Sequence, residues 1–478
     1  MTKTDTQPSA ADPSSNTGSI NVLTLVMVTS ALFLTLRNLP SLADAGLKML
    51  FFNSIAAFAF LIPVALVSAE LATGWPKNGV YHWVRAAYGP RFGFLASWLQ
   101  WAQSLFGMTS ILAYMAATFA YVFQPDLADD QLFVVGVVII VYWLATLANM
   151  RGMRLSGMIS TVCVSLGVLF PILVLVVLGI LYLVSGGHNH LAWSDDLSSW
   201  MPKPNDKIML LMFLNIIFGY VGVEVSASHA RDVRNVHRTY PIAIFSAAFI
   251  GFTLTLAGGF VVAVVLPAKD IDVVSGVVRA FDVFGDYFKL AWILPAAALL
   301  VALGAAGQVS TWIIGPVKGL FAVALAGDLP SVFQRTNKAG VPRNLLYAQA
   351  GIFSLIATTI LFFPDLDSAF MILTTIAVLL YSMMYCIMFS AAIFLRYKEP
   401  HVKRPYRIPG GNIGIWLVSG VGLITLLACF FIAFIPPPEL RFMSSWTFVA
   451  MLLGLTLVVL IIPLLIFWLR RRRRYFGK

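Results

Sequence analysis

Two charged residues, Arg37 and Glu224, lie within long apolar stretches of the chain. A guanidinium can hold a carboxylate with two parallel hydrogen bonds, and an isolated carboxylate can carry a proton. A charged group at the centre of a membrane span costs about 2.5–3.5 kcal/mol, so it normally faces the protein interior and has a function there. Both residues are therefore candidates for contact with a ligand.

Each of these residues also has structural alternatives that the sequence leaves open. Arg37 binds the carboxylate of a substrate, or it forms a fixed ion pair with Asp44 or Glu224, or its charged end reaches the membrane surface. Glu224 relays a proton, or it hydrogen-bonds to the interrupted backbone near Pro40 and holds it in place. An Arg37 that faces the substrate favours an acidic side chain such as that of glutamate or aspartate.

The backbone is interrupted beside both residues. One apolar stretch runs to Leu36, meets Arg37-Asn38-Leu39-Pro40 and resumes after Asp44-Ala45-Gly46, and another contains Phe218-Gly219-Tyr220-Val221-Gly222-Val223-Glu224. Proline removes a helical donor and glycine weakens a helix, so we predict unwinding at both places. Unwound backbone exposes amide and carbonyl groups that can bind a carboxylate and an ammonium group. The alternative is that these residues only kink packed helices.

The amino-acid composition indicates the class of protein to which these apolar stretches belong. Of 478 residues, 59% are hydrophobic and 11% are charged, whereas soluble domains carry about 25% charged residues. A run of roughly 20 apolar residues crosses the hydrocarbon core as a helix, because lipid offers the backbone no hydrogen-bond partners. The sequence therefore predicts an all-α polytopic membrane protein in contact with the lipid bilayer.

We predict twelve spans and a single transporter domain over residues 20–470. The spans lie near 22–39, 47–71, 92–123, 132–150, 155–184, 208–229, 240–266, 290–325, 345–363, 368–395, 414–435 and 446–469. Residues 1–19 are rich in Ser, Thr, Asp and Pro, which predicts a disordered cytoplasmic tail, and residues 470–478 form a basic cytoplasmic tail. The first apolar block is long enough to remain as a span, so we expect no signal peptide.

The positive charge follows the predicted topology. Of the 32 lysines and arginines, 23 fall on the side that holds both termini and 7 on the opposite side. This asymmetry is what the positive-inside rule expects, and it places both termini in the cytoplasm. The net charge of +11 is therefore a topology signal, and we expect no nucleic-acid partner.

The positions of the two interruptions indicate transport. They fall in the first and sixth spans, which are equivalent positions if residues 22–184 and 208–395 form two five-helix halves, with peripheral helices at 414–469. Interrupted spans at equivalent places in two halves indicate the central site of a secondary transporter. We therefore predict transport of a small molecule.

Several motifs resemble those of the amino acid–polyamine–organocation superfamily. The segment after the second span reads Ala69-Glu70-Leu71-Ala72-Thr73-Gly74-Trp75-Pro76-Lys77-Asn78-Gly79-Val80-Tyr81-His82-Trp83, and the sixth span continues as Ser228-His229-Ala230-Arg231-Asp232-Val233. Two further segments, Trp312-Ile313-Ile314-Gly315-Pro316-Val317-Lys318-Gly319 and Arg404-Pro405-Tyr406-Arg407-Ile408-Pro409-Gly410-Gly411, are similar to the bacterial glutamate/GABA antiporter family. The resemblance covers roughly residues 20–470.

The resemblance implies a leucine-transporter-like fold, with a 5+5 inverted repeat and two peripheral helices, in a bacterial inner membrane. It also implies exchange of an amino acid for its decarboxylation product, with glutamate and GABA as the lead pair, and neither an enzyme nor a cofactor. The substrate-binding residues that we predict combine the interruptions with this resemblance. They are Arg37, Asn38, Gly219, Tyr220, Gly222, Glu224, Gln308, Trp312, Tyr381 and Tyr385.

This chain departs from the family's pattern in places that bear on the substrate. Leu36-Arg37-Asn38-Leu39 stands where the family has an aromatic and acidic stretch, and Gln308 stands at its acidic position in the eighth helix. We also expect no C-terminal plug of the kind that closes the cytoplasmic path in the family. These departures leave the substrate pair and the pH response open.

The main alternative is a proton- or sodium-coupled symporter of neutral or cationic amino acids, with Ser310 and Thr311 as sodium ligands. An ATP-driven or hydrolytic membrane enzyme is disfavoured, because the sequence contains neither GxxxxGK[ST] nor HExxH. A channel is not indicated, because the sequence shows no ring of repeated filter residues. Cys163, Cys386 and Cys429 all lie in apolar blocks, so a disulfide framework is not expected.

Several other polar residues have structural interpretations. We expect Glu70 to clamp a helix to a loop, Lys318 to reach toward the cytoplasm, and His229 and His237 to be solvated. Gln100 and Gln103 face either the cavity or a neighbouring helix. A metal site at His188 and His190, beside Asp195 and Asp196, has no support in the sequence.

Overall fold

The computed structural model describes residues 20–77, 79–202, 207–272, 275–437, 440 and 443–476. The predicted disordered tail at residues 1–19 lies outside this range. Apart from one isolated parallel bridge between Ile20 and Val233, the described residues form helices, turns and loops and contain no β-strand. The all-α prediction is confirmed for this part of the chain.

The described residues form seventeen α-helices, joined in places by short 3₁₀ or π segments labelled η. The α-helices are α1 (Val22–Phe33), α2 (Leu39–Asp44), α3 (Met49–Ala56), α4 (Ile62–Gly74), α5 (Val80–Tyr88), α6 (Pro90–Ala120), α7 (Gln131–Met150), α8 (Met153–Val164), α9 (Phe170–Val184), α10 (Lys207–Phe218), α11 (Val236–Val265), α12 (Gly276–Phe288), α13 (Ile293–Leu325), α14 (Arg343–Thr358), α15 (Leu366–Lys398), α16 (Gly411–Ile432) and α17 (Ser445–Phe476). The segments used below are η1 (Leu36–Asn38) and η7 (Val223–Asp232).

Ten stretches of helix in the described residues are long and apolar enough to cross a membrane. The bent pair Val22–Phe33 and Leu36–Asp44 makes an eleventh when it is counted as one span. The remaining predicted span corresponds to α6, which has 31 residues but carries Gln100, Gln103 and several hydroxyl side chains. A multi-span membrane protein is therefore confirmed, and the count of twelve remains a prediction.

Both predicted interruptions are present, and the first begins earlier than the sequence suggested. Helix α1 ends at Phe33, Leu34 and Thr35 are extended, and α2 leaves at 43° to α1. Pro40 lies in the first turn of α2, where its missing N–H has no helical partner to lose. In the sixth span, α10 ends at Phe218, and η7 starts after Gly222.

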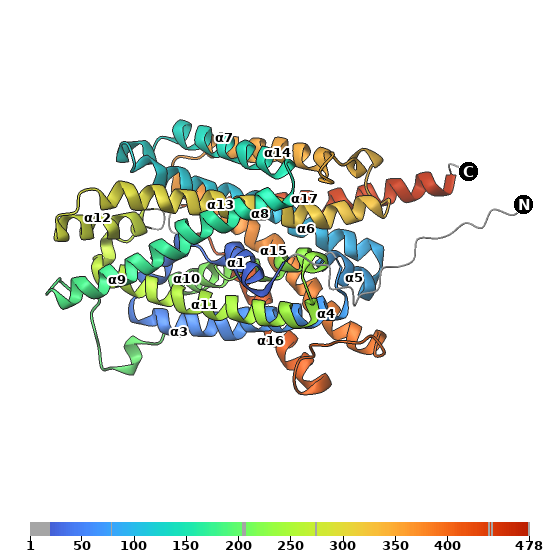
Figure 1. Cartoon of the computed structure of the whole chain (residues 1–478), viewed down its shortest axis with the longest axis horizontal. Coiled ribbons are helices and arrows are strands. Elements are labelled where there is room, and N and C mark those ends of the chain that lie inside the picture. The colour runs from blue at the N-terminus through green and yellow to red at the C-terminus, as the bar shows by residue number, and fades with distance from the viewer. Residues whose placement is uncertain are drawn as a thin grey trace, which may run out of the picture.

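Helix α6 lies at the centre of the bundle, packed along α13 and α15 (Figure 1). Helix α1 packs against α11 and η7, so the two interrupted spans meet inside the bundle. Helices α16 and α17 lie at the periphery, and α17 exposes large apolar side chains such as Leu457 and Trp468. Such an exposed apolar belt is suited to lipid.

Both ends of the described chain lie at the same end of the bundle. Ile20 exchanges backbone hydrogen bonds with the segment after η7, where its N–H donates to the Asp232 carbonyl at 3.0 Å. Arg470 donates to the carbonyl of Gly327, just beyond α13. Since Lys318 of α13 contacts Asp232, these two places are neighbours. That this end faces the cytoplasm remains a prediction.

Candidate functional site

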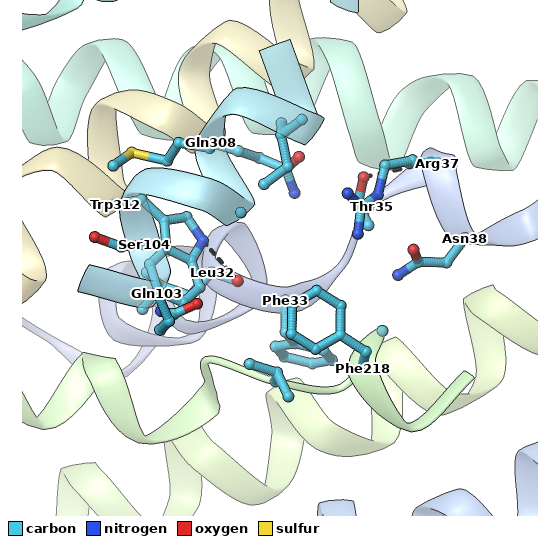
Figure 2. A pocket seen from close by; sticks show the side chains of 15 residues that line it. Leu32, Phe33, Thr35, Arg37, Asn38, Gln103, Ser104, Phe218, Gln308 and Trp312 are labelled. Carbon is cyan, nitrogen blue, oxygen red and sulfur yellow. Dashed lines mark hydrogen bonds between the residues drawn. The ribbon is translucent and has the colours of Figure 1, made fainter. Parts of the chain in front are cut away.

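A cavity with about 40 Å³ of space for water-sized molecules lies where the two interrupted spans meet α6 and α13 (Figure 2). Five of the ten predicted site residues line it: Arg37, Asn38, Gly219, Gln308 and Trp312. The fold thus brings together residues that are up to 275 positions apart in the sequence, from Arg37 to Trp312.

Arg37 is buried at one end of this cavity, with 6% of its surface exposed. Its Nη1 donates to Ser110 Oγ at 2.8 Å, and its guanidinium carbon lies 5.2 Å from the centre of the Phe370 ring. The ion pairs between described residues do not include Arg37. The alternative of a fixed ion pair with Asp44 or Glu224 is therefore wrong for this structure. So is reach to the membrane surface, since the side chain is buried in the bundle.

The first interruption is stabilised by side chains of α13. The indole of Trp312 donates to the Leu32 carbonyl at 2.9 Å (Figure 2), and the Gln308 amide donates to the Leu34 carbonyl. Both carbonyls lie at the end of α1, where the helix no longer supplies partners. Gln308 and Trp312 therefore shape the cavity by holding its backbone wall.

The second interruption depends on two glycines that allow close approach. A Cβ at Gly219 would lie 2.6 Å from Asn38 Nδ2, so the two unwound segments are in direct contact. Gly222 has φ +109°, and a Cβ there would lie 2.5 Å from the Trp312 ring. A larger residue at position 219 would displace the Asn38 side chain, and one at position 222 would meet the Trp312 ring and the Leu32 carbonyl in a backbone conformation that favours glycine.

The cavity contains an unpaired donor and an unpaired acceptor. Arg37 Nε and Gln308 Oε1 are both buried without a hydrogen-bond partner. The lining includes one cationic side chain, Arg37, and no acidic one among the described residues. Because a buried polar group without a partner is unfavourable, these two atoms are suited to a ligand that carries an anionic acceptor and an ammonium donor.

Glu224 does not line this cavity, and it is held by other side chains. Tyr381 donates to its Oε1 at 2.5 Å, Gln100 donates to Oε1 at 2.9 Å, and Tyr385 donates to Oε2. The Gly222 N–H donates to the Tyr385 hydroxyl at 3.1 Å. Glu224 therefore supports the interruption of the sixth span through Tyr385, and not the interruption near Pro40. Its part in proton transfer remains a prediction.

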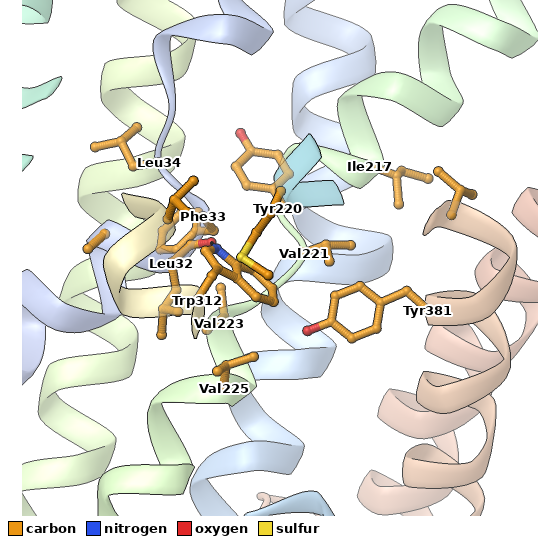
Figure 3. Close-up of a cluster of buried hydrophobic side chains, with 14 of the residues drawn as sticks. Leu32, Phe33, Leu34, Ile217, Tyr220, Val221, Val223, Val225, Trp312 and Tyr381 are labelled. Carbon is orange, nitrogen blue, oxygen red and sulfur yellow. Dashed lines mark hydrogen bonds between the residues drawn. The ribbon is translucent and has the colours of Figure 1, made fainter. Parts of the chain in front are cut away.

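Tyr220, Tyr381 and Tyr385 lie beside the cavity and not in its wall. The Tyr220 hydroxyl donates to Asn53 on α3, and in Figure 3 its ring points away from Trp312. Tyr381 and Tyr385 line a second, smaller cavity with about 10 Å³ of space for water-sized molecules, which shares Phe218 and Val221 with the first. Their hydroxyls are engaged with Glu224, which is why they do not reach the first cavity.

Sequence reasoning did not name Ser104 and Ser110, and it left Gln103 open between the cavity and a neighbouring helix. Gln103 and Ser104 of α6 line the wall at the end opposite Arg37 (Figure 2), and Ser110 of the same helix contacts Arg37. Polar side chains at positions 100, 103, 104 and 110 repeat with helical spacing, and this pattern could have predicted a polar face on α6. Gln100 and Gln103 are now placed: Gln100 binds Glu224 and Gln103 faces the cavity.

Glu70 clamps a helix to a loop, as predicted. The Arg396 guanidinium donates to both Glu70 oxygens, and the Ile408 N–H donates to Oε2 at 2.9 Å. Arg404 Nε lies 3.5 Å from Glu70 Oε1. This buried arrangement joins α4, α15 and the loop before α16, far from the cavity lining.

Of the other expectations about polar residues, that for His229 is corrected. Lys318 points to the end of the bundle that holds Ile20 and Arg470, where its Nζ lies 3.1 Å from Asp232 Oδ2 and 3.1 Å from His229 Nδ1, and whether that end is cytoplasmic remains a prediction. His229 is partly buried in this contact and is not freely solvated. Ser310 and Thr311 are engaged within the protein, with Asn149 and the Gly307 carbonyl respectively. No described group of three or more His, Cys, Asp or Glu side chains could hold a metal.

Comparison with known proteins adds to this geometry. The family model described as amino acid permease matches residues 20–464. The chain is 36% identical to an uncharacterized transporter of Legionella pneumophila, over 93% of this chain and 95% of the relative. It is 30% identical to a glutamate/gamma-aminobutyrate antiporter of Lactococcus lactis, over 96% and 92% respectively. A probable agmatine/putrescine antiporter of the same species is 23% identical over 82% of this chain and 83% of its own.

Proposed function

The chain belongs to the amino acid permease family, and we propose that within it the protein exchanges an acidic amino acid for the amine formed by its decarboxylation. Glutamate and GABA are the pair that we propose. The relatives at 30% identity carry that activity in their names. The proposal for this chain rests on the cavity itself.

The observation that carries the proposal is the unpaired charge of Arg37 in a cavity without a carboxylate. An arginine fork is suited to a carboxylate, because two parallel N–H groups match its two oxygens. With Ser110 holding Nη1, the unpaired Nε is available for the ligand. A cationic diamine would meet a like charge here, so the cavity disfavours the substrates of the agmatine/putrescine type.

Glutamate and GABA share the two groups that the cavity can recognise. Decarboxylation removes the α-carboxylate of glutamate and leaves its side-chain carboxylate and its amine. We propose that Arg37 binds the side-chain carboxylate, which both partners retain, and that the ammonium group is accepted by Gln308 Oε1 and the unwound backbone. One site then serves both directions of the exchange.

The proposed mechanism is alternating access between two five-helix halves. We propose that α6 also crosses the membrane, which brings the number of spans to twelve. We further propose that the halves cover residues 22–184 and 208–395, and that both termini face the cytoplasm of a bacterial inner membrane. Across the two interruptions Asn38 contacts Gly219, and Trp312 contacts Gly222 and the Leu32 carbonyl. Movement of one interrupted span is thereby transmitted to the other.

An exchange assay in proteoliposomes tests the proposal. Vesicles loaded with unlabelled glutamate, GABA, aspartate, glutamine, lysine or putrescine are given external radiolabelled glutamate. We expect rapid uptake into vesicles loaded with glutamate or GABA and none into empty vesicles. Uptake into empty vesicles driven by a proton or sodium gradient would favour the symporter alternative. Faster glutamate uptake into vesicles loaded with putrescine or lysine than into vesicles loaded with glutamate or GABA would overturn the assignment of the substrate.

A further inference from the structure

A second cluster of titratable side chains joins η7 to α13, one turn or more beyond the cavity. Lys318 Nζ contacts Asp232 Oδ2 and His229 Nδ1, each at 3.1 Å. An ammonium only donates hydrogen bonds, so Nδ1 carries a lone pair and His229 is the neutral Nε2–H tautomer. The hydrogen bond to Lys318 therefore occupies the position that a further proton would take.

The three residues link the two walls of the cavity. Asp232 and His229 belong to η7, the second half of the interrupted sixth span, whereas Lys318 lies two to three turns after Gln308 on α13. The cluster lies at the end of the bundle that holds Ile20 and Arg470. Separation of Lys318 from η7 is thus one way to open the proposed cytoplasmic path to the cavity.

Other titratable groups lie on the elements packed against η7. On α4 the group is Glu70, which is paired with Arg396. Helix α5 carries Tyr81, His82, Arg85 and Tyr88, and α11 carries His237, Arg238 and Tyr240. The other titratable residues of η7 itself are Glu224 and Arg231. Helix α1 has none, and α13 has Lys318. Burial, with Arg231, Lys77 and Arg85, lowers the pKa of His82 to about 4, so His82 stays neutral over the physiological range.

We propose that His229, Lys318 and Asp232 form a proton-binding site, separate from the substrate cavity, whose protonation releases η7 from α13. A proton on Nδ1 converts His229 to an imidazolium that can no longer accept from Lys318. Two cations then face each other across the contact, and Asp232 alone cannot neutralise both. The proton comes from the aqueous phase on that side, and no other reactant is needed.

The same geometry sets the direction of the pH effect. In the joined arrangement Lys318 blocks Nδ1, whereas in the separated arrangement His229 is solvated and titrates near pH ~6.5. Protons therefore bind the separated arrangement, and acid draws the equilibrium toward it. Lowering the pH from about 7.5 to about 5.5 shifts that equilibrium by about tenfold.

The proposal does not depend on the identity of the substrate, and its main test measures access and not transport. Ser228 lies beside His229, and its hydroxyl is buried without a partner. In a background without the three native cysteines, Ser228→Cys is labelled with a membrane-impermeant methanethiosulfonate at pH 7.5 and pH 5.5. The variant His229→Gln keeps an acceptor for Lys318 and cannot be protonated, so each pH is compared with that variant.

At each pH we divide the labelling rate of Ser228→Cys with native His229 by the rate with His229→Gln. We expect this ratio to be about fivefold or more higher at pH 5.5 than at pH 7.5. Asp232→Asn should raise labelling at pH 7.5 by itself. His237→Gln, a histidine of the next helix without a contact to Lys318, is the matched control and should behave as the wild type. Equal ratios at the two pH values would overturn the proposal.

A second measurement covers the case in which His229→Gln folds poorly. Lys318→Gln removes the ammonium while leaving His229 intact, and it should abolish the pH dependence of Ser228→Cys labelling and hold the rate at the wild-type acid level. An unchanged pH dependence in folded Lys318→Gln would refute the site. Failure of glutamate exchange, by contrast, would refute only the proposed substrate.

Discussion

Arg37 and Arg396 are both almost fully buried, with 6% and 4% of their surfaces exposed, yet they have opposite surroundings. Arg396 binds both oxygens of Glu70 and also donates to the Gly411 carbonyl at 3.1 Å. Arg37 has one side-chain hydrogen bond, to Ser110, and its Nε has no partner. The fold supplies Arg396 with a carboxylate partner, whereas it leaves Arg37 without one.

The difference indicates which buried charge is structural and which is functional. A buried ion pair with both partners in place holds its elements together, and loss of one partner leaves an uncompensated charge. A buried charge without a partner destabilises the protein that contains it, so its presence points to a ligand that supplies the missing carboxylate. We therefore propose that Arg37 acts in transport, whereas Arg396 stabilises the fold.

The largest effect on stability is expected when the satisfied arginine loses its partner. Glu70→Gln leaves Arg396 and Arg404 without their carboxylate, which should destabilise the protein by about 3–5 kcal/mol. The measurement is the thermal unfolding temperature of the purified protein in detergent, with the yield as a second readout. An unfolding temperature equal to that of the wild type would contradict the structural role of the clamp.

The reverse result is expected for the unsatisfied arginine. Arg37→Met keeps much of the side-chain volume and removes an unpaired charge, so the unfolding temperature should be unchanged or higher. Exchange of glutamate should be lost. A marked fall in the unfolding temperature would show that Arg37 is structural after all, and that the contrast with Arg396 fails.

A smaller effect is expected when the charge of residue 37 is kept and its shape is changed. Arg37→Lys retains a cation but loses the planar fork, so the KM for glutamate should rise by about tenfold or more. Exchange is measured over a range of external glutamate concentrations. An unchanged KM would mean that a point charge suffices and that the fork is not used.

The smallest effect is expected for the residue that orients Arg37. Ser110→Ala removes the hydrogen bond to Nη1 and also the contact of Ser110 with the Thr374 hydroxyl at 2.9 Å. Loss of one such bond is worth about 1 kcal/mol, so we expect a several-fold rise in KM with a normal unfolding temperature. Thr109→Val, on the same helix with its hydroxyl bonded to the Leu105 carbonyl, is the control.

Sequence reasoning found the interruptions because Pro40, Gly219 and Gly222 act on the local backbone. It predicted the clamp at Glu70 because this residue lies at the end of the second predicted span. It could not foresee that Tyr381 and Tyr385 turn toward Glu224, or that Lys318 meets His229. Those contacts join helices distant in sequence, and their geometry follows from packing and not from local pattern.

The central claim is that Arg37 binds the carboxylate that glutamate retains on becoming GABA. Glutamine carries an amide in place of that carboxylate, so equilibrium binding of radiolabelled glutamate and glutamine to wild-type protein and to Arg37→Gln tests the claim most directly. We predict that the wild type prefers glutamate by about tenfold or more and that Arg37→Gln loses this preference. The same preference in both proteins would contradict the account.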